Sequence, residues 1–422
     1  MSNQTEWVRR LLEPAYYRFY LLPKIRIYQE KQLRAIRKRG QVRLTFLVSS
    51  LPMWRFQSIF DRLRTDERFD LSVAILPFPG YSKSQKESAV QELGAHFKAV
   101  GASIIDLSEA TKPGTRLREQ VDPDVIFYPQ PYNHLFENDM DSTFFMDKLL
   151  CYIPYGMLTV DDPWAFRSFL CNVAWRLLLG GEARFMDTKS ILYNKGKNIR
   201  FTGDPMADIY CRKSSQDPWK SQLQNKKRVI WAPHFSIVKN DMLTRDSFSW
   251  LHQLMLDIAQ QYQDRIQFAF KPHPRLFTEL CNHPSWGKER AEEYYNLWKN
   301  GPNTQLETGP YVDLFKGSDA MIHDSGSFTA EYHYTGRPVL FTTQDMSMSE
   351  KGLNVMGKAA LRIHYQGKSK EDIIHFLDNV VLKGEDSMQA RRLAFRNKFL
   401  TIPEGKNVAD NVYNELVSSI WK

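Results

Sequence analysis

Short apolar runs alternate with polar stretches along most of the chain, beginning near residue 42. In the first half the apolar runs lie at 42–50, 71–77, 102–107 and 124–129. The segments between them, such as 84–100, are polar and compatible with helices. Strands of this length that alternate with helices predict a parallel sheet covered by helices.

A break in this rhythm lies at about 205–227, where the chain is polar and rich in turn residues. Beyond it four more apolar runs follow, at 228–233, 266–271, 319–324 and 338–343. The pattern therefore predicts two α/β units that are joined around residues 205–225.

Length and composition agree with two units. At 422 residues the chain is long for one domain and comfortable for two. Its 42% hydrophobic and 13% aromatic residues suffice for full cores, which excludes a largely disordered protein. We expect a basic, aromatic N-terminal arm (1–40), a Rossmann-like unit (41–205), a second Rossmann-like unit (206–384) and closing C-terminal helices (385–422).

The four cysteines lie far apart and none forms a C-x-x-C pair, which argues against a disulfide framework or a zinc site and fits a reducing cytosol. Charges occupy the N-terminal stretch where the apolar core of a signal peptide would lie. No apolar run approaches the roughly 20 residues that a spanning helix needs. We therefore expect a cytoplasmic protein that is soluble or peripheral on the membrane.

The net charge of +9 is concentrated in residues 1–40, where ten Lys and Arg face three Glu among many Trp, Tyr and Leu residues. This mixture suits the headgroup layer of an anionic membrane, so we expect peripheral contact with the inner face of the cell membrane. The stretch 164–181 has a similar character. Ordinary helices packed on the first unit are the alternative for both stretches. We expect no nucleic-acid partner, because no recognition module accompanies the charge.

The segment 311–332 carries the clearest chemical signal. It predicts a buried strand at 320–323, then a turn, then a helix that opens at 325–327. Backbone N–H groups at such a helix start bind anions, most often phosphate. Asp324 precedes the turn, and Glu331 lies on the helix, where its carboxylate could reach a ribose hydroxyl.

Two further strand ends carry basic side chains. Ligands of open parallel sheets bind beyond the carboxyl ends of the strands. Lys271, His273 and Arg275 follow one predicted strand in a loop stiffened by two prolines, which suits a diphosphate. His234 follows another strand, whereas His323 lies inside an apolar strand and is expected in the core.

These motifs together resemble those of the CDP-glycerol glycerophosphotransferase family, which contains teichoic acid primases and polymerases. The resemblance rests on WAPHFS (231–236), FKPHP (270–274), FTGDPMAD (201–208) and the segment 311–332, in the family's order. It covers about residues 200–345. It implies two Rossmann-like domains that face each other across a cleft (GT-B-like), with the nucleotide held by the C-terminal half.

The first unit departs from the family pattern. Tyr155 and Gly156 stand where the family carries His-Gly, whose histidine is taken as the catalytic base. A tyrosine with an ordinary pKa near 10 is a poor base at neutral pH. His134 and the pair Asp161-Asp162 are the nearest titratable alternatives.

The resemblance implies transfer of a polyol phosphate from a CDP-linked donor, such as CDP-glycerol, to a hydroxyl of a cell-surface glycan or lipid-linked acceptor, with release of CMP. We expect catalytic roles for His273, His134 and Asp161. The expected donor-binding residues are His234, Lys271, Arg275, Asp324, Ser325, Gly326, Ser327 and Glu331. No metal or other cofactor is expected. The alternatives are a GT-B glycosyltransferase that uses a nucleotide sugar, and a catalytically impaired binding homologue.

Overall fold

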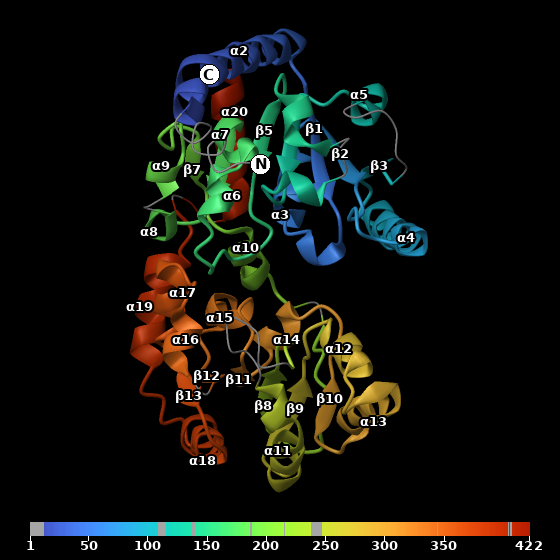
Figure 1. Ribbon diagram of the computed structural model, residues 1–422, viewed down its shortest axis with the longest axis vertical. Coiled ribbons are helices and arrows are strands. Elements are labelled where there is room, and N and C mark those ends of the chain that lie inside the picture. Colours follow the sequence, from blue (N-terminus) through green and yellow to red (C-terminus); the bar gives the residue numbers. More distant parts are fainter. Residues whose placement is uncertain are drawn as a thin grey trace. The chain divides into compact units, whose positions relative to one another are not determined.

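The computed structural model describes residues 12–108, 115–136, 140–185, 188–214, 216–237, 247–343, 345–403, 405 and 407–422. The chain forms two compact α/β units (Figure 1). The first contains residues 1–156, 162–208 and 401–422, and the second contains 157–161 and 209–400. Two Rossmann-like units were predicted, and this fold class is confirmed.

The first unit is built on a parallel seven-stranded sheet with the order β3-β2-β1-β4-β5-β6-β7. Its strands are β1 (Val42–Val48), β2 (Phe69–Ile75), β3 (Ser103–Asp106), β4 (Val125–Tyr128), β5 (Leu149–Tyr152), β6 (Arg176–Leu179) and β7 (Ile199–Phe201). The four strands predicted in this half are confirmed within two residues at each end. The strand order reverses between β1 and β4, which is where open sheets of this kind bind ligands.

The helices of the first unit include two long segments near its termini. A π-helical turn (Tyr17–Leu21) leads into α2 (Leu22–Arg39), and α20 (Val408–Trp421) ends the chain. The other α-helices are α3 (Gln57–Leu63), α4 (Lys83–Ala99), α5 (Arg116–Gln120), α6 (Pro163–Arg167), α7 (Phe169–Val173), α8 (Glu182–Phe185), α9 (Thr188–Ile191) and α10 (Pro205–Cys211), which runs into the second unit. Short 3₁₀ turns lie at Leu51–Met53, Asn133–Leu135 and Ser142–Phe145.

The stretch 164–181 does not form one membrane-facing surface. It divides into α6, α7 and the strand β6, whose three leucines are buried in the sheet. The suggestion of a second membrane contact here is therefore wrong, because these apolar side chains pack in the core of the first unit.

The second unit is built on a parallel six-stranded sheet with the order β10-β9-β8-β11-β12-β13. Its strands are β8 (Lys227–Ala232), β9 (Ile266–Phe270), β10 (Thr304–Leu306), β11 (Ala320–His323), β12 (Val339–Thr342) and β13 (Tyr365–Gly367). All four strands predicted here are confirmed, and the order reverses between β8 and β11. Aromatic side chains, among them Trp231, Phe270 and Trp298, fill one face of this sheet.

The helices of the second unit begin with α11 (Phe248–Gln261) and end with α19 (Gln389–Phe399). Between them lie α12 (Leu276–Asn282), α13 (Gly287–Asn300), α14 (Val312–Lys316), α15 (Phe328–Glu331), a 3₁₀ turn (Tyr332–Thr335), α16 (Met346–Glu350), α17 (Val355–Leu361), α18 (Lys370–His375) and a π-helical turn (Phe376–Leu382).

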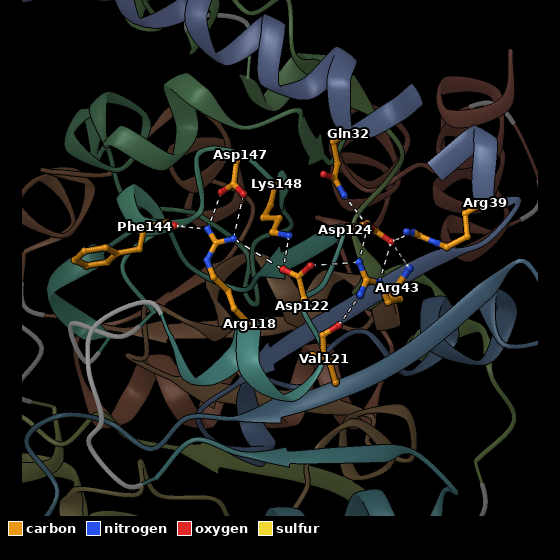
Figure 2. Close-up of polar contacts among 10 residues, drawn as sticks. All are labelled: Gln32, Arg39, Arg43, Arg118, Val121, Asp122, Asp124, Phe144, Asp147 and Lys148. Atoms are coloured by element: carbon orange, nitrogen blue, oxygen red, sulfur yellow. Dashed lines mark hydrogen bonds and ion pairs between the residues drawn. The ribbon is translucent and has the colours of Figure 1, made fainter. Parts of the chain in front are cut away.

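A buried carboxylate ties α2 to the first sheet (Figure 2). Asp124, which has no exposed surface, precedes β4. Its carboxylate accepts hydrogen bonds from Gln32 Nε2 (2.6 Å) and from the Arg43 backbone N–H (2.8 Å), and it pairs with the Arg39 guanidinium. Gln32 and Arg39 belong to α2 and Arg43 to β1, so one side chain fixes the helix against the sheet.

We expect Asp124→Asn to lower the free energy of unfolding by about 2 kcal/mol, because the amide removes the charge that its arginine partners face. Urea unfolding of the variant measures this loss. Asp70→Asn, an exposed change on β2, is the control and should change stability by under about 0.5 kcal/mol. Equal stability of the two variants would contradict the role of Asp124 in fixing α2 against the sheet.

Candidate functional site

The predicted donor-binding residues gather at the point where the second sheet reverses its strand order. Ala232 of β8 lies opposite His323 of β11 in the register, so the loops after these two strands leave the sheet side by side. The loop after β9 borders the same edge, since β9 pairs with β8. His234, His273 and the turn after His323 are thereby brought to one place.

Two histidines, His234 and His273, lie close together at this edge. Their ring centroids are 5.4 Å apart. Nδ1 of His273 accepts the Arg275 backbone N–H (3.2 Å), and Nδ1 of His234 accepts the Ser236 backbone N–H (3.3 Å). Because Nδ1 is the acceptor in both rings, each neutral imidazole carries its proton on Nε2. Both histidines are therefore hydrogen-bond donors through Nε2.

Burial and neighbouring cations keep His273 neutral at physiological pH. Burial, together with the positive charges of Arg275 and Lys271, lowers the pKa of His273 to about 4. Burial also lowers the pKa of Lys271, although Glu307 partly offsets this effect. The Lys271 ammonium donates to the carbonyl of Gly309 (3.0 Å). Arg275 lies over the ring of Phe235, 4.2 Å from its centroid.

Asp324 is turned into the protein. Its side chain is fully buried and accepts the backbone N–H of His234 (2.6 Å), together with the backbone N–H (3.2 Å) and hydroxyl (2.5 Å) of Ser247. The carboxylate thus joins the end of β11, the loop after β8 and the start of α11. This geometry gives Asp324 a positioning role, since it fixes the loop that carries His234.

The turn after β11 leads into a short helix. The helix expected to open at 325–327 begins at Phe328 and has only four residues, so its dipole is small. The Ser325 backbone N–H donates to Nδ1 of His323 (3.1 Å), and the hydroxyl of Thr159 donates to the carbonyl of Gly326 (3.5 Å). Ser327 is the N-cap of α15, so the helix starts where the sequence predicted, but α15 is shorter than expected before it continues as a 3₁₀ turn.

Glu331 ends α15 and is nearly buried. Its carboxylate accepts hydrogen bonds from the hydroxyls of Tyr210 (3.3 Å) and Tyr311 (3.1 Å). These two tyrosines hold the carboxylate in one orientation. No sequence pattern predicted these two partners, because their distances from Glu331 along the chain differ and follow no motif.

Three buried histidines lie behind the turn. His323 Nε2 and His364 Nε2 are 3.1 Å apart, and His364 Nδ1 donates to the carbonyl of Ala360 (2.7 Å). The His364 ring therefore accepts through Nε2, and His323 donates to it. His333 packs against His364 with ring centroids 4.9 Å apart, and Arg392 contributes positive charge to the group. The expected core position of His323 is confirmed.

Acid should destabilise the protein through this cluster. Burial lowers the pKa of His364 to about 4, whereas a histidine in the unfolded chain titrates near pH 6.5. Between these values the unfolded state binds more protons, so stability falls as the pH drops from about 6.5 to 4. Between pH 7 and pH 5 we expect the free energy of unfolding to fall by about 2 kcal/mol less in His364→Gln than in the wild type. Urea unfolding at the two pH values measures this difference. The exposed change His134→Gln is the control. An unaltered pH dependence of stability in H364Q would show that His364 does not cause the loss of stability in acid.

The catalytic candidates at 134, 161 and 162 are divided between the two units. His134 is exposed on its 3₁₀ turn, and its ring centroid is 5.8 Å from that of Tyr132. The Tyr132 hydroxyl donates to Asp162 (2.5 Å), which also caps α6. Asp161 belongs to the second unit, where its backbone N–H donates to the carbonyl of Gly352 (2.7 Å). His134 therefore lies beside Tyr132, whose hydroxyl contacts Asp162.

Within the described ranges, no group of three or more His, Cys, Asp and Glu side chains is arranged to hold a metal ion. The charges offered by the edge of the second sheet are instead those of Lys271 and Arg275. An anion of pyrophosphate type is the ligand that two cations and two imidazole N–H donors suit best.

Comparison with known proteins identifies the relatives of this chain. Residues 188–418 match the family described as CDP-glycerol:poly(glycerophosphate) glycerophosphotransferase. The teichoic acid glycerol-phosphate primase of Bacillus spizizenii is 28% identical over 179 residues, a stretch that covers 40% of this chain and 40% of the primase.

Solved structures share the fold at low sequence identity. A variant of the wall teichoic acid polymerase TagF superposes with a TM-score of 0.59 at 12% identity, covering 99% of this chain and 98% of the polymerase. The S. aureus MnaA–UDP structure gives a TM-score of 0.56 at 12% identity, with 90% and 97% covered. The UDP-GlcNAc 2-epimerase of Neisseria meningitidis bound to UDP-GlcNAc gives 0.53 at 13% identity, with 89% and 99% covered. With its family match extending over more than half of the sequence, the chain belongs to the CDP-glycerol:poly(glycerophosphate) glycerophosphotransferase family.

Proposed function

We propose that this protein transfers glycerol phosphate from CDP-glycerol to a hydroxyl group of a cell-surface glycan or lipid-linked acceptor in teichoic acid synthesis. The observation that carries the proposal is the convergence of His234, His273, Lys271 and Arg275 at the switch point of the second sheet. Family membership and the likeness to a teichoic acid primase support the choice of donor.

In the proposed reaction, an acceptor oxygen attacks the phosphorus that carries the glycerol. A new phosphorus–oxygen bond forms to the acceptor, the bond to the bridging oxygen breaks, and CMP leaves with that oxygen. The acceptor hydroxyl gives its proton to a general base. Charge develops on the bridging and terminal oxygens, and fixed donors at this position lower the barrier.

The second unit supplies those donors in the proposal. The Nε2–H groups of His273 and His234 bond the pyrophosphate oxygens, and Lys271 and Arg275 balance their charge. The turn Ser325-Gly326-Ser327 borders the same phosphates. Glu331, oriented by its two tyrosines, bonds the ribose hydroxyls.

The first unit supplies the acceptor side in the proposal. His134 is the better-supported general base, because it is exposed and lies beside Tyr132 and Asp162. Histidine is the side chain that most often serves as a general base, which suits this role better than the phenol at position 155. Asp161, which belongs to the segment 157–161 of the second unit, is the second candidate for the general base.

The test is a transfer assay with CDP-glycerol labelled in the glycerol and membranes that carry acceptor. CMP release together with label in the membrane fraction is the expected result. Label transfer from a nucleotide sugar, but not from CDP-glycerol, would replace the proposal with glycosyl transfer. Binding of CDP-glycerol without CMP release in the presence of acceptor would mark a non-catalytic homologue.

Peripheral attachment to the cytoplasmic face of an anionic membrane is also proposed. Its support is an apolar stripe on the exposed side of the first helical segment, formed by Leu12, Tyr16, Phe19, Tyr20 and Ile27. Residues 1–11 of the basic arm lie outside the described residues. Among the residues that are described, no helix is both long and apolar enough to cross a membrane.

A further inference from the structure

A pocket of about 130 Å³ lies in the first unit beside α2. Its walls come from α2, from the residues around the start of β6 and from the loop before β7. The pocket is therefore at the amino ends of the strands, at the opposite edge of the sheet from the loop that carries His134. None of the proposed steps of glycerol phosphate transfer uses it.

The lining of this pocket is positively charged. It contains Arg26, Arg176 and Lys197, and none of its twelve residues is acidic. Arg176 is paired with Glu415 (2.5 Å) and donates to Ser419 (2.7 Å). Arg26 and Lys197 are exposed, and neither side chain has a carboxylate partner in the part of the chain that the structure describes. Two cations at the pocket are therefore available to pair with an anion.

The walls of the pocket are held rigidly. Asn198 Nδ2 donates to the carbonyls of Cys171 (3.0 Å) and Ala174 (2.9 Å), and Gln29 Nε2 donates to the carbonyl of Val173 (3.1 Å). The Asn198 amide oxygen is buried and has no hydrogen-bond partner among the described residues.

The pocket adjoins the apolar stripe. Leu22 and Ile25 line it, whereas Ile27, two residues further along α2, is 68% exposed on the stripe. A ligand bound here would reach apolar surface and cationic groups at once. An anionic phospholipid has this combination: a phosphate, a polar headgroup and acyl chains.

We propose that this pocket binds the phosphate of an anionic phospholipid headgroup, with Arg26 and Lys197 as its cationic contacts. The inference rests on the proposed membrane attachment and adds a headgroup site to it. Attachment then depends on the lipid species and not on surface charge alone.

The test is flotation of the full-length protein with phosphatidylcholine vesicles that contain phosphatidylglycerol. The pocket variant is Arg26→Gln with Lys197→Gln. The matched control is Lys31→Gln with Arg34→Gln, which removes one lysine and one arginine from exposed positions of α2 outside the pocket. We expect the pocket variant to bind about fivefold more weakly than the control, since each cation near the surface adds roughly 1 kcal/mol and the pocket cations add headgroup contacts.

If vesicle binding weakens equally in both variants, the headgroup site is overturned, and general electrostatic attraction explains the binding. Inorganic phosphate could stabilise the wild type and the control but not the pocket variant, while all three proteins bind the vesicles equally well. That result would overturn the lipid as the source of the phosphate. A wild-type protein that fails to float on these vesicles would overturn membrane attachment as well. The transfer assay does not depend on this result, because both variants leave the donor-binding edge of the second unit unchanged.

Discussion

Replacing His273 with alanine is expected to lower the turnover number at least about a hundredfold. His273 is held by Pro233 and Arg275 through backbone hydrogen bonds and stays neutral at pH 7, because burial lowers its pKa to about 4. Its Nε2–H is therefore a fixed donor that needs no reorganisation as charge develops on the phosphates. The rate of CMP release at saturating CDP-glycerol measures the effect.

The chain offers a close control for this change. His283 is also followed by proline, and its Nδ1 likewise accepts the backbone N–H two residues later, from Ser285 (3.2 Å). It lies at the end of α12, away from the switch point of the sheet. His283→Ala should keep turnover within about twofold of the wild type, as expected for a residue that touches no reacting group. A folded His273→Ala variant with near-normal turnover would remove His273 from the reaction.

Replacing Asp324 with alanine is expected to lower the free energy of unfolding by about 4 kcal/mol and to abolish stabilisation by CDP-glycerol. The change leaves two buried backbone N–H groups, of His234 and Ser247, and the Ser247 hydroxyl without their acceptor. The loop that positions His234 then loses its anchor. Urea unfolding measures the first effect, and thermal shift with CDP-glycerol measures the second.

Asp319 provides the comparison. It precedes strand β11, whereas Asp324 follows the last residue of that strand. Its carboxylate accepts the Arg228 backbone N–H (2.9 Å) and pairs with Lys227 (3.2 Å). Asp319→Ala should destabilise the protein less, because this carboxylate is partly exposed, and should preserve stabilisation by CDP-glycerol. Retained donor binding in a folded Asp324→Ala variant would contradict the positioning role.

The sequence carried enough information to predict four strands of each sheet and the position of Lys271 and His273 at the end of one of them. Strands β9, β11 and β12 are fully buried and β8 is buried from Val229 onward, and such strands appear as continuous apolar runs. Lys271 and His273 directly follow one of these runs, so their place at the sheet edge follows from the strand itself. The edge strands β10 and β13 have three residues each and contain glutamine, so they gave no such signal.

Long-range hydrogen bonds could not be predicted in the same way. Asp324 accepts hydrogen bonds from Ser247, which lies 77 residues away along the chain, so the inward turn of this carboxylate depends on how α11 packs. The tyrosines that hold Glu331 are set by tertiary packing as well. Strand β6 was hidden inside an apolar stretch, because its three leucines are flanked by residues of the same character.

The most direct test of the donor site is calorimetric binding of CDP-glycerol and of UDP-N-acetylglucosamine to the same preparation of protein. The comparison is informative because epimerases that act on UDP-GlcNAc share this fold. A dissociation constant for CDP-glycerol at least about tenfold below that for UDP-N-acetylglucosamine, a difference of about 1.4 kcal/mol, is the expected result. Tighter binding of UDP-N-acetylglucosamine, or no binding of CDP-glycerol, would contradict the assignment of the second unit as a CDP-glycerol site.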